Sequence, residues 1–484
     1  MNLTRKLWIA PLWRQLWTVS AVLISMVSQG MVLGYTTSLL PALQAQDSPI
    51  KVDLEMSSWL MASIGISCSF GFIYSSYIMN VYGRRIAYIM DSIPQIVGLI
   101  LIYYASDFSD LIIGRLLCGA TVGATSILGA IIIGEYTSPK YRCMFLNLET
   151  TAVFVGTTIV HLLGHYFNWR IIAIINLMPT LASVAITCTW PESPAWLASN
   201  KEFGECERNF IWLRGEDVAA RNELNELIKS QQVDKANLGF LLQVMEFGMK
   251  FTKKELLKPI TIFFFAVILL ETSGRHVFPA YATEIVNDIT GSDKYSMYYT
   301  LYLDMIITLS ASFSTALIKI MKLRTLLFST GAASVFVLLI VCTYLFLTSN
   351  GIILNIPWIP IVLFGLYLVL INIGCAPIPL TLIGTIFPLA HRGVGTTLAG
   401  MFVSLTMVAS LKIIPLSLAS IKVYGTFTVL ALVMVFSLLV LFFILPETKD
   451  RTLQEIENYF YDDSFGDDDE YLEEMIDSNK TVIV

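Results

Sequence analysis

Twelve long apolar stretches dominate this sequence, and short polar breaks separate most of them. A helix that crosses a bilayer needs about 20 largely apolar residues. Its backbone polar groups must bond to one another because the hydrocarbon offers no water. The stretches cover approximately residues 16–36, 57–79, 87–105, 108–134, 144–164, 171–190, 258–278, 297–318, 325–347, 358–384, 394–418 and 424–445. We therefore expect an all-α membrane protein with twelve transmembrane helices.

The composition excludes an ordinary soluble protein, because only 14% of the residues are charged and 55% are hydrophobic, whereas about 25% are charged in soluble domains. The first apolar stretch is of spanning length and lacks a small-residue cleavage site, so we expect it to remain as the first helix. With the N-terminus inside, most loop Lys and Arg residues lie on the cytoplasmic side. Both termini are predicted to be cytoplasmic.

One long polar break, residues 191–257, divides the chain into two sets of six stretches, and the loops of the two sets correspond. GEYTSPKYR at 134–142 matches GTIFPLAHR at 384–392, and PESPAWL at 191–197 matches PETKDRTL at 446–453. The same order of motifs indicates a duplication of a six-helix unit, a known plan for secondary transporters. The expected parts are a cytoplasmic N-terminus (1–15), a six-helix bundle (16–190), a cytoplasmic linker with short helices (191–257), a second six-helix bundle (258–445) and an acidic cytoplasmic tail (446–484).

These loops carry a family resemblance. Together with GRR at 83–85, GRLLCG at 114–119, the pair Ser273 and Gly274, APIP at 376–379 and FPLAHRG at 387–393, they resemble the sugar porter branch of the major facilitator superfamily. Within that branch the chain is similar to the facilitated trehalose transporter-like proteins of insects. The resemblance implies the major facilitator fold and a facilitative carrier in the cell membrane. It would move a sugar or a related small polar solute by alternating access.

A nutrient sensor on the same fold, which binds solute without substantial flux, is the alternative reading. An enzyme is not expected, because the sequence shows no nucleophile with a nearby base, no metal-ligand spacing and no phosphate-binding glycine loop. We expect no cofactor and no nucleic-acid partner. The acidic tail reads as a solvated segment, with a cytoplasmic docking partner as the alternative.

Three ionisable residues, Glu271, Arg275 and His276, lie in the seventh apolar stretch. Such residues within a membrane usually face a protein interior or a wet cavity. Glu271 and Arg275 are four residues apart and can pair along one helix face, with Lys412 as another partner for Glu271. Gly274 and Pro279 interrupt the helix, as is tolerated where backbone lines a cavity. A salt bridge that only holds this helix in place remains the alternative.

The resemblance adds candidate contacts for the solute. Aligned on Ser273, the family's two glutamines fall on Leu270 and Glu271, and its usual asparagine falls on His276. Similar alignment puts Thr150 where helix five normally offers glutamine, Leu380 after PIP where tryptophan is usual, and Val403 and Ser404 at a typical Asn-Trp pair. The expected substrate-binding residues are Thr150, Glu271, Ser273, His276, Leu380 and Ser404. Tyr281, Tyr302 and Asp304 are further polar candidates.

Charged loop residues form a second candidate group. We expect them at the cytoplasmic ends of the helices, where they can form an ion-pair network between the bundles while the inner side is closed, or simply anchor the helix ends. The group consists of Arg85, Arg115, Glu135, Arg142, Glu192, Arg324, Arg392 and Glu447. The first stretch carries no Asp or Glu where proton-coupled members of the family place one, which favours facilitated diffusion. His161 is expected at the membrane interface.

Overall fold

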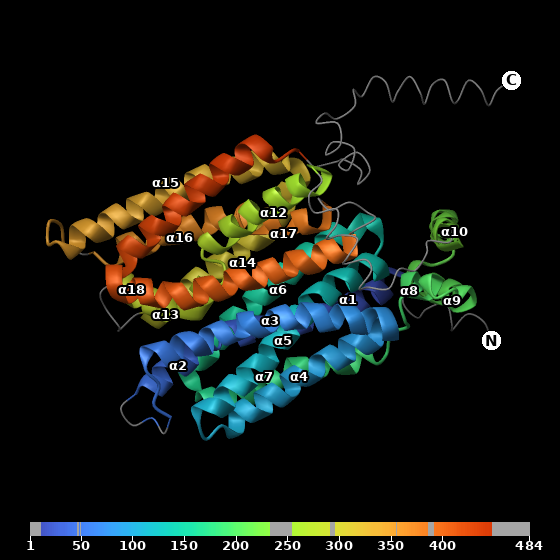
Figure 1. Ribbon diagram of the computed structural model, residues 1–484, viewed down its shortest axis with the longest axis horizontal. Coiled ribbons are helices and arrows are strands. Elements are labelled where there is room, and N and C mark those ends of the chain that lie inside the picture. Colours follow the sequence, from blue (N-terminus) through green and yellow to red (C-terminus); the bar gives the residue numbers. More distant parts are fainter. Residues whose placement is uncertain are drawn as a thin grey trace.

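The computed structural model describes residues 11–45, 48, 50–232, 254–290, 296–354, 356–385 and 392–447. Every regular element within these ranges is an α-helix. The predicted cytoplasmic N-terminus up to residue 10, the last part of the predicted linker and the acidic tail from residue 448 lie outside the described residues. The helices form two bundles side by side, with the three linker helices at one end (Figure 1). We call this end the linker end and the opposite end the far end.

The N-terminal bundle contains six spans, the first of which is broken. Tyr35 separates its two parts, which together form one apolar segment of 34 residues. The helices are α1 (Pro11–Gly34), α2 (Thr36–Gln44), α3 (Leu54–Tyr82), α4 (Arg84–Tyr104), α5 (Phe108–Tyr136), α6 (Pro139–Tyr166) and α7 (Trp169–Thr187). Residues that favour helix starts stand at several of these boundaries: the Asp53 side chain caps α3, and Pro139 stands in the first turn of α6.

The linker folds into the short helices expected from its amphipathic pattern. They are α8 (Pro194–Ser199), α9 (Phe203–Arg214) and α10 (Val218–Gln232). Leu197, Cys206, Phe210 and Leu224 form their common core. The Ser193 side chain accepts a hydrogen bond from the Trp196 backbone and caps α8. The described part of residues 191–257 thus forms a small helical unit against the N-terminal bundle.

The C-terminal bundle holds the other six predicted spans. Its helices are α12 (Lys254–Thr272), α13 (Val277–Thr290), α14 (Ser296–Ile320), α15 (Leu323–Ser349), α16 (Trp358–Ile373), α17 (Pro377–Thr385) and α18 (Arg392–Ile444). The described residues contain eleven apolar helical segments of spanning length, and the last, of 47 residues, contains a break at Lys422. This segment supplies spans eleven and twelve, so all twelve predicted spans are helical.

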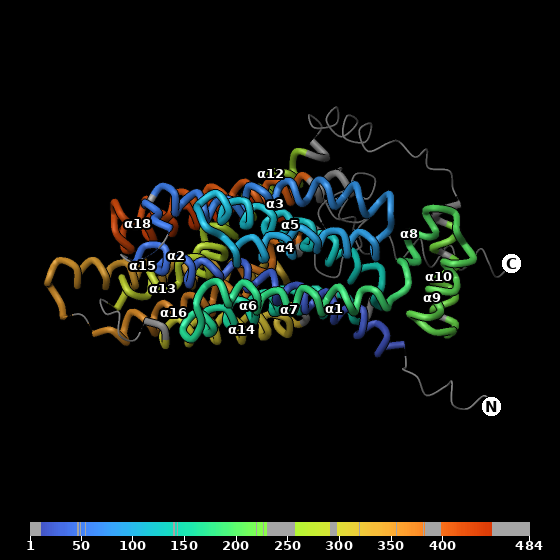
Figure 2. The backbone as a smooth tube through the Cα atoms, turned by 90° about the horizontal axis from the view of Figure 1, so that it is seen from below, coloured from blue at the N-terminus to red at the C-terminus, as the bar shows by residue number. Residues whose placement is uncertain are grey.

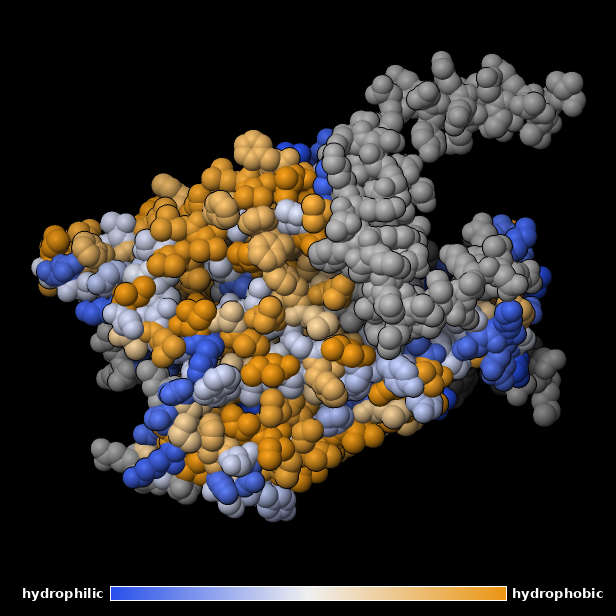
Figure 3. Space-filling model, in the orientation of Figure 1, coloured by the Kyte–Doolittle hydropathy of each residue, from blue (hydrophilic) through white to orange (hydrophobic). Residues whose placement is uncertain are grey.

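The surface of the two bundles is inverted relative to a soluble protein. Large apolar side chains such as Phe70, Met178 and Phe443 are 64%, 70% and 81% exposed, and an apolar belt covers the bundles between more polar ends (Figure 3). Polar groups lie inside instead: Ser28 of α1 donates to Asn176 of α7 at 2.7 Å and accepts from Gln95 of α4 at 2.7 Å. Exposed apolar surface on this scale indicates a lipid-facing, multi-pass membrane protein.

The most extensive contacts between the bundles are made by two equivalent pairs of spans, namely α3 with the first leg of α18 and α6 with α14. Figure 2 shows both pairs side by side along the molecule. In the duplication, span two (α3) corresponds to span eight (α14), and span five (α6) corresponds to span eleven. The second contact is therefore the first with the two bundles exchanged, as the repeat in the loops predicts.

Close backbone contact between α1 and α6 generates a prediction for stability. A Cβ atom added at Gly156 would lie 2.0 Å from the carbonyl oxygen of Val27, so Gly156→Ala forces the two helices apart. Overpacking of this kind costs about 1–3 kcal/mol. We expect a lower melting temperature of the detergent-solubilised protein, measured by thermal-shift size-exclusion chromatography.

Gly134→Ala is the matched control, because a Cβ atom there meets nothing within 4 Å. Alanine is the better helix former, so this variant should melt at or above the parent temperature. Equal melting temperatures for Gly156→Ala and the parent would contradict the packing argument.

Candidate functional site

The seventh span breaks near its middle, between α12 and α13. Gly274 adopts a φ of +87°, a conformation that glycine accepts readily, and Pro279 lacks a backbone donor. The freed groups find partners: Tyr367 of α16 donates to the Ser273 carbonyl at 2.9 Å, and the Phe278 amide donates to the Gly274 carbonyl at 2.9 Å. The break predicted from sequence is confirmed, and it places residues 273–276 in a turn.

Glu271 pairs with His276 across this turn. The His276 Nδ1 atom lies 2.8 Å and 3.0 Å from the two carboxylate oxygens, and Glu271 is only 3% exposed. Among the described residues no hydrogen bond joins Glu271 to Arg275, because helical i,i+4 geometry ends at Thr272 and the turn redirects the following residues. The predicted attraction between the two charges is present without that contact. Lys412 does not pair with Glu271 either. It donates to Ser58 of α3 at 2.8 Å and lies 4.0 Å from the Trp59 ring centroid.

Arg275 points across the interface instead. Its guanidinium carbon lies 5.7 Å from the ring centroid of Phe154 in α6, and its buried Nη1 has no hydrogen-bond partner among the described residues. Glu271 and, to a lesser degree, Glu149 of α6 interact electrostatically with this guanidinium. The sequence reasoning missed Glu149, although an acidic residue within the fifth apolar stretch was the same signal that identified Glu271.

A small cavity lies beside the turn. Ser273, Arg275 and Asn372 contribute polar groups to its wall, Phe154 comes from the opposite bundle, and apolar side chains such as Ile307 complete it. Ser273 is fully buried, and its hydroxyl donates to the Leu270 carbonyl at 2.7 Å. Charged, hydroxyl, amide and aromatic groups from both bundles therefore converge at the centre of the molecule.

The remaining predicted solute contacts are spread along the interface. Thr150 lies half-buried on α6, one residue after Glu149. Ser404 of α18 donates to the Gly65 carbonyl at 2.5 Å and accepts from Ser69 at 2.9 Å, which ties it to α3. Leu380 is half-buried in α17 and is not among the described residues that line the cavity. Ser404 joins the bundles, a role that the sequence did not indicate.

Of the further polar candidates, Tyr302 differs from expectation and Tyr281 lies in the interior. Tyr302 is 51% exposed on the outer surface of α14, so it does not face the interior. Tyr281 is buried, and its hydroxyl donates to the Leu411 carbonyl at 3.2 Å.

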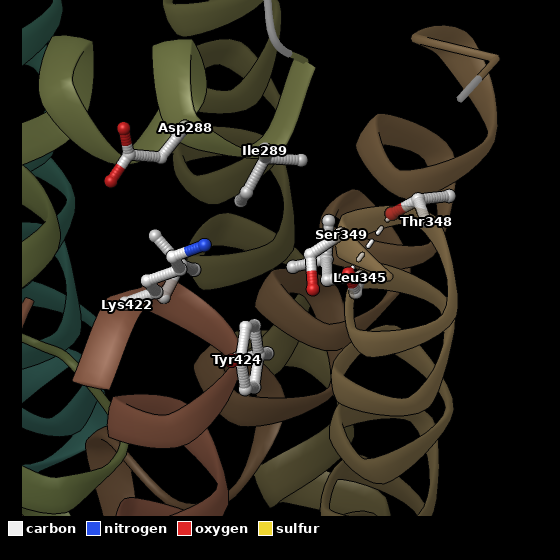
Figure 4. A pocket seen from close by; sticks show the side chains of 8 residues that line it. Asp288, Ile289, Leu345, Thr348, Ser349, Lys422 and Tyr424 are labelled. Atoms are coloured by element: carbon white, nitrogen blue, oxygen red, sulfur yellow. Dashed lines mark hydrogen bonds between the residues drawn. The ribbon is translucent and has the colours of Figure 1, made fainter. Parts of the chain in front are cut away.

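A larger cavity of about 370 Å³ lies at the far end of the C-terminal bundle. Asp288, Lys422 and Tyr424 face it from α13 and α18, and Thr348 donates to the Leu345 carbonyl at 3.0 Å on its α15 wall (Figure 4). Its described lining comes from this one bundle, so it does not lie on the interface.

The predicted cytoplasmic charges at the linker end pair within each bundle. In the N-terminal bundle, Arg84 binds Glu135 at 2.9 Å, and Ser193 donates to the same carboxylate. Glu192 accepts hydrogen bonds from the backbone amides of Arg84 and Arg85 at 2.7 and 3.2 Å, at the start of α4. Burial raises the pKa of Glu192, and these donors oppose that effect. The Arg85 side chain reaches the Cys188 carbonyl at 2.6 Å.

The C-terminal bundle repeats this arrangement. Glu447 accepts from the backbone amides of Leu323 and Arg324 at 3.2 and 3.0 Å, at the start of α15. The Arg324 side chain reaches the Phe442 carbonyl at 2.6 Å. Carboxylates are favourable at helix N-termini because unpaired amides and the helix dipole converge there. Arg392 begins α18, and its side chain lies outside the described residues.

One member of the predicted charged group, Arg115, lies elsewhere. It is near the far end, buried, with its Nη1 donating to the Val32 carbonyl at 3.0 Å. Twenty residues of α5 separate it from Glu135, a distance of about 30 Å along a helix. This error arose because motif membership was used without following the direction of the span. Arg142 stands at the linker end, in the first turn of α6, half-buried near Arg214.

His161 also contradicts its predicted place at the membrane interface. It is 3% exposed, and its Nδ1 lies 2.6 Å from the carboxylate of Asp304 in α14. This pair was not predicted, since the partners are 143 residues apart in the chain.

Two duplicated six-helix bundles, with a broken helix and convergent polar groups between them, define a membrane transporter of the major facilitator fold. The family model described as Sugar (and other) transporter matches residues 21–460. The chain therefore belongs to the sugar (and other) transporter family and is a transport protein, not an enzyme.

Known relatives match this sequence over nearly the whole chain. It is 26% identical to the facilitated trehalose transporter Tret1 of Bombyx mori, over 92% of this chain and 86% of that protein. The protein of the same name from Polypedilum vanderplanki is also 26% identical, over 91% and 87%. The fold matches the proton:xylose symporter XylE bound to 6-bromo-6-deoxy-D-glucose, with a TM-score of 0.75, 18% identity and coverage of 93% and 99%. The inward open conformation of XylE from E. coli matches with a TM-score of 0.72 at 17% identity, with the same coverage.

The repeated carboxylate caps give a second prediction. Glu192→Ala and Glu447→Ala each remove an acceptor from two helix-start amides, which should destabilise the protein by about 1–2 kcal/mol. A lower melting temperature in detergent would report the loss. Glu205→Ala is the control, because its ion pair with Arg208 is exposed and such pairs contribute about 0–1 kcal/mol. A melting temperature for either cap variant equal to that of the control would contradict the capping role.

Proposed function

We propose that this protein is a facilitative carrier of a sugar, of the trehalose or hexose type, or of a related small polar solute. It works by alternating access of a central site to the two sides of the membrane. The observation that carries the proposal is the break between α12 and α13, which brings polar and charged groups to the interface of two duplicated bundles. Substrate sites of such duplicated carriers lie near the midplane between the repeats. The printed names of the relatives support a sugar as the solute.

In this proposal the cell membrane holds the protein with its linker end and both termini in the cytoplasm. Arg84, Arg85 and Arg324 stand at the linker end, and the positive-inside rule favours that side as cytoplasmic. The acidic tail after Glu447, outside the described residues, would then face cytoplasmic partners.

The solute binds beside the turn of the seventh span. Glu271 and His276 provide a charged hydrogen-bonding pair, Ser273 a backbone and hydroxyl contact, and Thr150 a hydroxyl from the opposite bundle. Leu380 of α17 and Ser404 of α18 complete the proposed set of contacts from outside the small cavity. Glu271, His276 and Thr150 replace the amide side chains that the family usually offers at these three positions.

Alternating access assigns a role to the charges at the linker end. We propose that Arg85, Glu135, Arg142, Glu192, Arg324, Arg392 and Glu447 contribute to a network between the bundles when the cytoplasmic side is closed. In the present structure the bundles are joined at the far end, and the described charges pair within their own bundles. This arrangement is the one expected when the network is broken. Arg115, at the far end, takes no part in it.

Facilitated diffusion fits the first span. The α1–α2 segment carries no Asp or Glu, and Arg115 donates to the Val32 carbonyl of α1. With no carboxylate there to exchange a proton, flux should follow the solute gradient alone.

Uptake of labelled trehalose and glucose in a heterologous cell tests the proposal. We expect saturable uptake of at least one sugar that does not change with external pH. Glu271→Gln removes a buried charge and restores the family's amide, so the KM for a neutral sugar should fall by about tenfold, equivalent to about 1.4 kcal/mol.

Glu55→Gln, at an exposed position in the first turn of α3, is the control and should leave uptake unchanged. Surface expression is measured for each variant. Absence of saturable flux for both sugars from a well-expressed parent would overturn the sugar assignment, and pH-dependent flux would overturn facilitated diffusion.

A further inference from the structure

A buried ion pair joins the two bundles near the far end. His161 belongs to α6 of the N-terminal bundle and Asp304 to α14 of the C-terminal bundle. The His161 Nδ1 and the Asp304 carboxylate oxygen are 2.6 Å apart, and the two side chains are 1% and 3% exposed. Among the described residues this is the salt bridge that crosses from one bundle to the other.

The second nitrogen of His161 extends the contact to the broken seventh span. Its Nε2 lies 3.2 Å from the Pro279 carbonyl, in the first turn of α13. The ring also packs against α1, since a Cβ added at Gly34 would lie 3.1 Å from Nε2. One imidazole therefore connects α1 and α6 with α13 and α14, and both of its nitrogens contact the opposite bundle.

Other hydrogen bonds also cross from one bundle to the other. Thr36 donates to the Ala280 carbonyl at 3.0 Å, and the Lys412 ammonium donates to Ser58 at 2.8 Å. When the bundles separate, each of these donors exchanges one neutral acceptor for water. His161 and Asp304 instead lose a direct contact between a carboxylate and an imidazole at 2.6 Å. Hydrogen bonds to a charged group are stronger than neutral ones, so this pair should contribute strongly to closure at this end.

The two ends of the molecule differ in whether their described ion pairs cross from one bundle to the other. At the linker end the described charges pair within a bundle, so those contacts survive movement of one bundle against the other. The His161–Asp304 contact lies between the bundles, and rocking them apart at the far end must break it. It is a two-state contact, made in one arrangement and absent in the other, of the kind that sets a conformational equilibrium.

We propose that His161 and Asp304 form the latch that holds the far end closed, and that this latch must open before a solute can enter or leave at that end. Both residues act by positioning the two bundles along the solute pathway. The inference rests on the alternating-access cycle of the proposed function, but its test requires no transported solute.

The experiment measures access to the cavity from outside the cell. Ile307 lies one turn along α14 from Asp304, lines the central cavity and is 4% exposed. An Ile307→Cys reporter is labelled on intact cells with a membrane-impermeant maleimide, and the parent without the reporter gives the background from native cysteines. Adding Asp304→Asn or His161→Asn should raise the labelling rate about tenfold, equivalent to a shift of about 1.4 kcal/mol toward the open far end.

The chain offers a matched control with the same substitution. Asp91 of α4 is also a buried carboxylate, and it accepts from Ser75 of α3 at 2.5 Å within the N-terminal bundle. Asp91→Asn alters a buried carboxylate contact that does not cross the interface, so labelling at Ile307→Cys should stay at the parent rate. In the exchanged double variant, His161→Asp with Asp304→His, labelling should return toward the parent rate. Each single variant should label faster than the parent.

Unchanged labelling in Asp304→Asn and His161→Asn, at parental surface levels, would overturn the latch. So would an equal rise in Asp91→Asn. If neither single variant reaches the surface, the double variant His161→Asn with Asp304→Asn carries the test, because it leaves no unpaired charge. Parental labelling of that double variant overturns the proposal. Loss of sugar flux with the labelling pattern intact would count against the sugar assignment alone.

Discussion

The break in the seventh span depends on the hydrogen bond from Tyr367 to the Ser273 carbonyl. A helix that stops inside hydrocarbon leaves backbone groups without water, and each must find a partner in the protein. The buried Tyr367 hydroxyl of α16 supplies one such partner from within the same bundle. Only because the turn is satisfied there can Glu271, Arg275 and His276 occupy the middle of the membrane and reach the interface between the bundles.

Some structural features are repeated in the two halves of the duplication, and others occur in only one half. The carboxylate caps at Glu192 and Glu447 repeat, as do the two interface contacts of α3 with α18 and α6 with α14. The caps connect helix ends within each bundle, and the repeated contacts join the two bundles. Among the described residues, three features have no counterpart in the other half: the charged turn in the seventh span, Glu149 opposite it, and the His161–Asp304 pair. The two halves of the duplication therefore differ in the ionisable residues at their interface.

Much of the architecture followed from the sequence, because bilayer thickness and backbone hydrogen bonding restrict an apolar chain to few solutions. The twelve spans, the duplication and the linker helices were all predictable on that basis. Side-chain partners were not. The predicted contact of Glu271 with Arg275 used helical spacing across the predicted break, whereas the φ of Gly274 redirects the chain before Arg275. His161 and Asp304 meet through packing of distant helices, and Arg115 was misplaced because a motif does not state how far along its span it lies.

The turn at Lys422 has a mechanical consequence. Spans eleven and twelve meet at this residue, whose backbone is left-handed with a φ of +58°. The first leg of α18 contacts α3 across the interface, and the second leg packs against α15, where Phe328 and Phe442 stack at 5.3 Å. With no flexible loop between them, the two legs form a stiff hairpin. A movement of the first leg of α18 at the interface is therefore transmitted to its second leg on the lipid-facing side of the C-terminal bundle. Membrane thickness and tension act on that side.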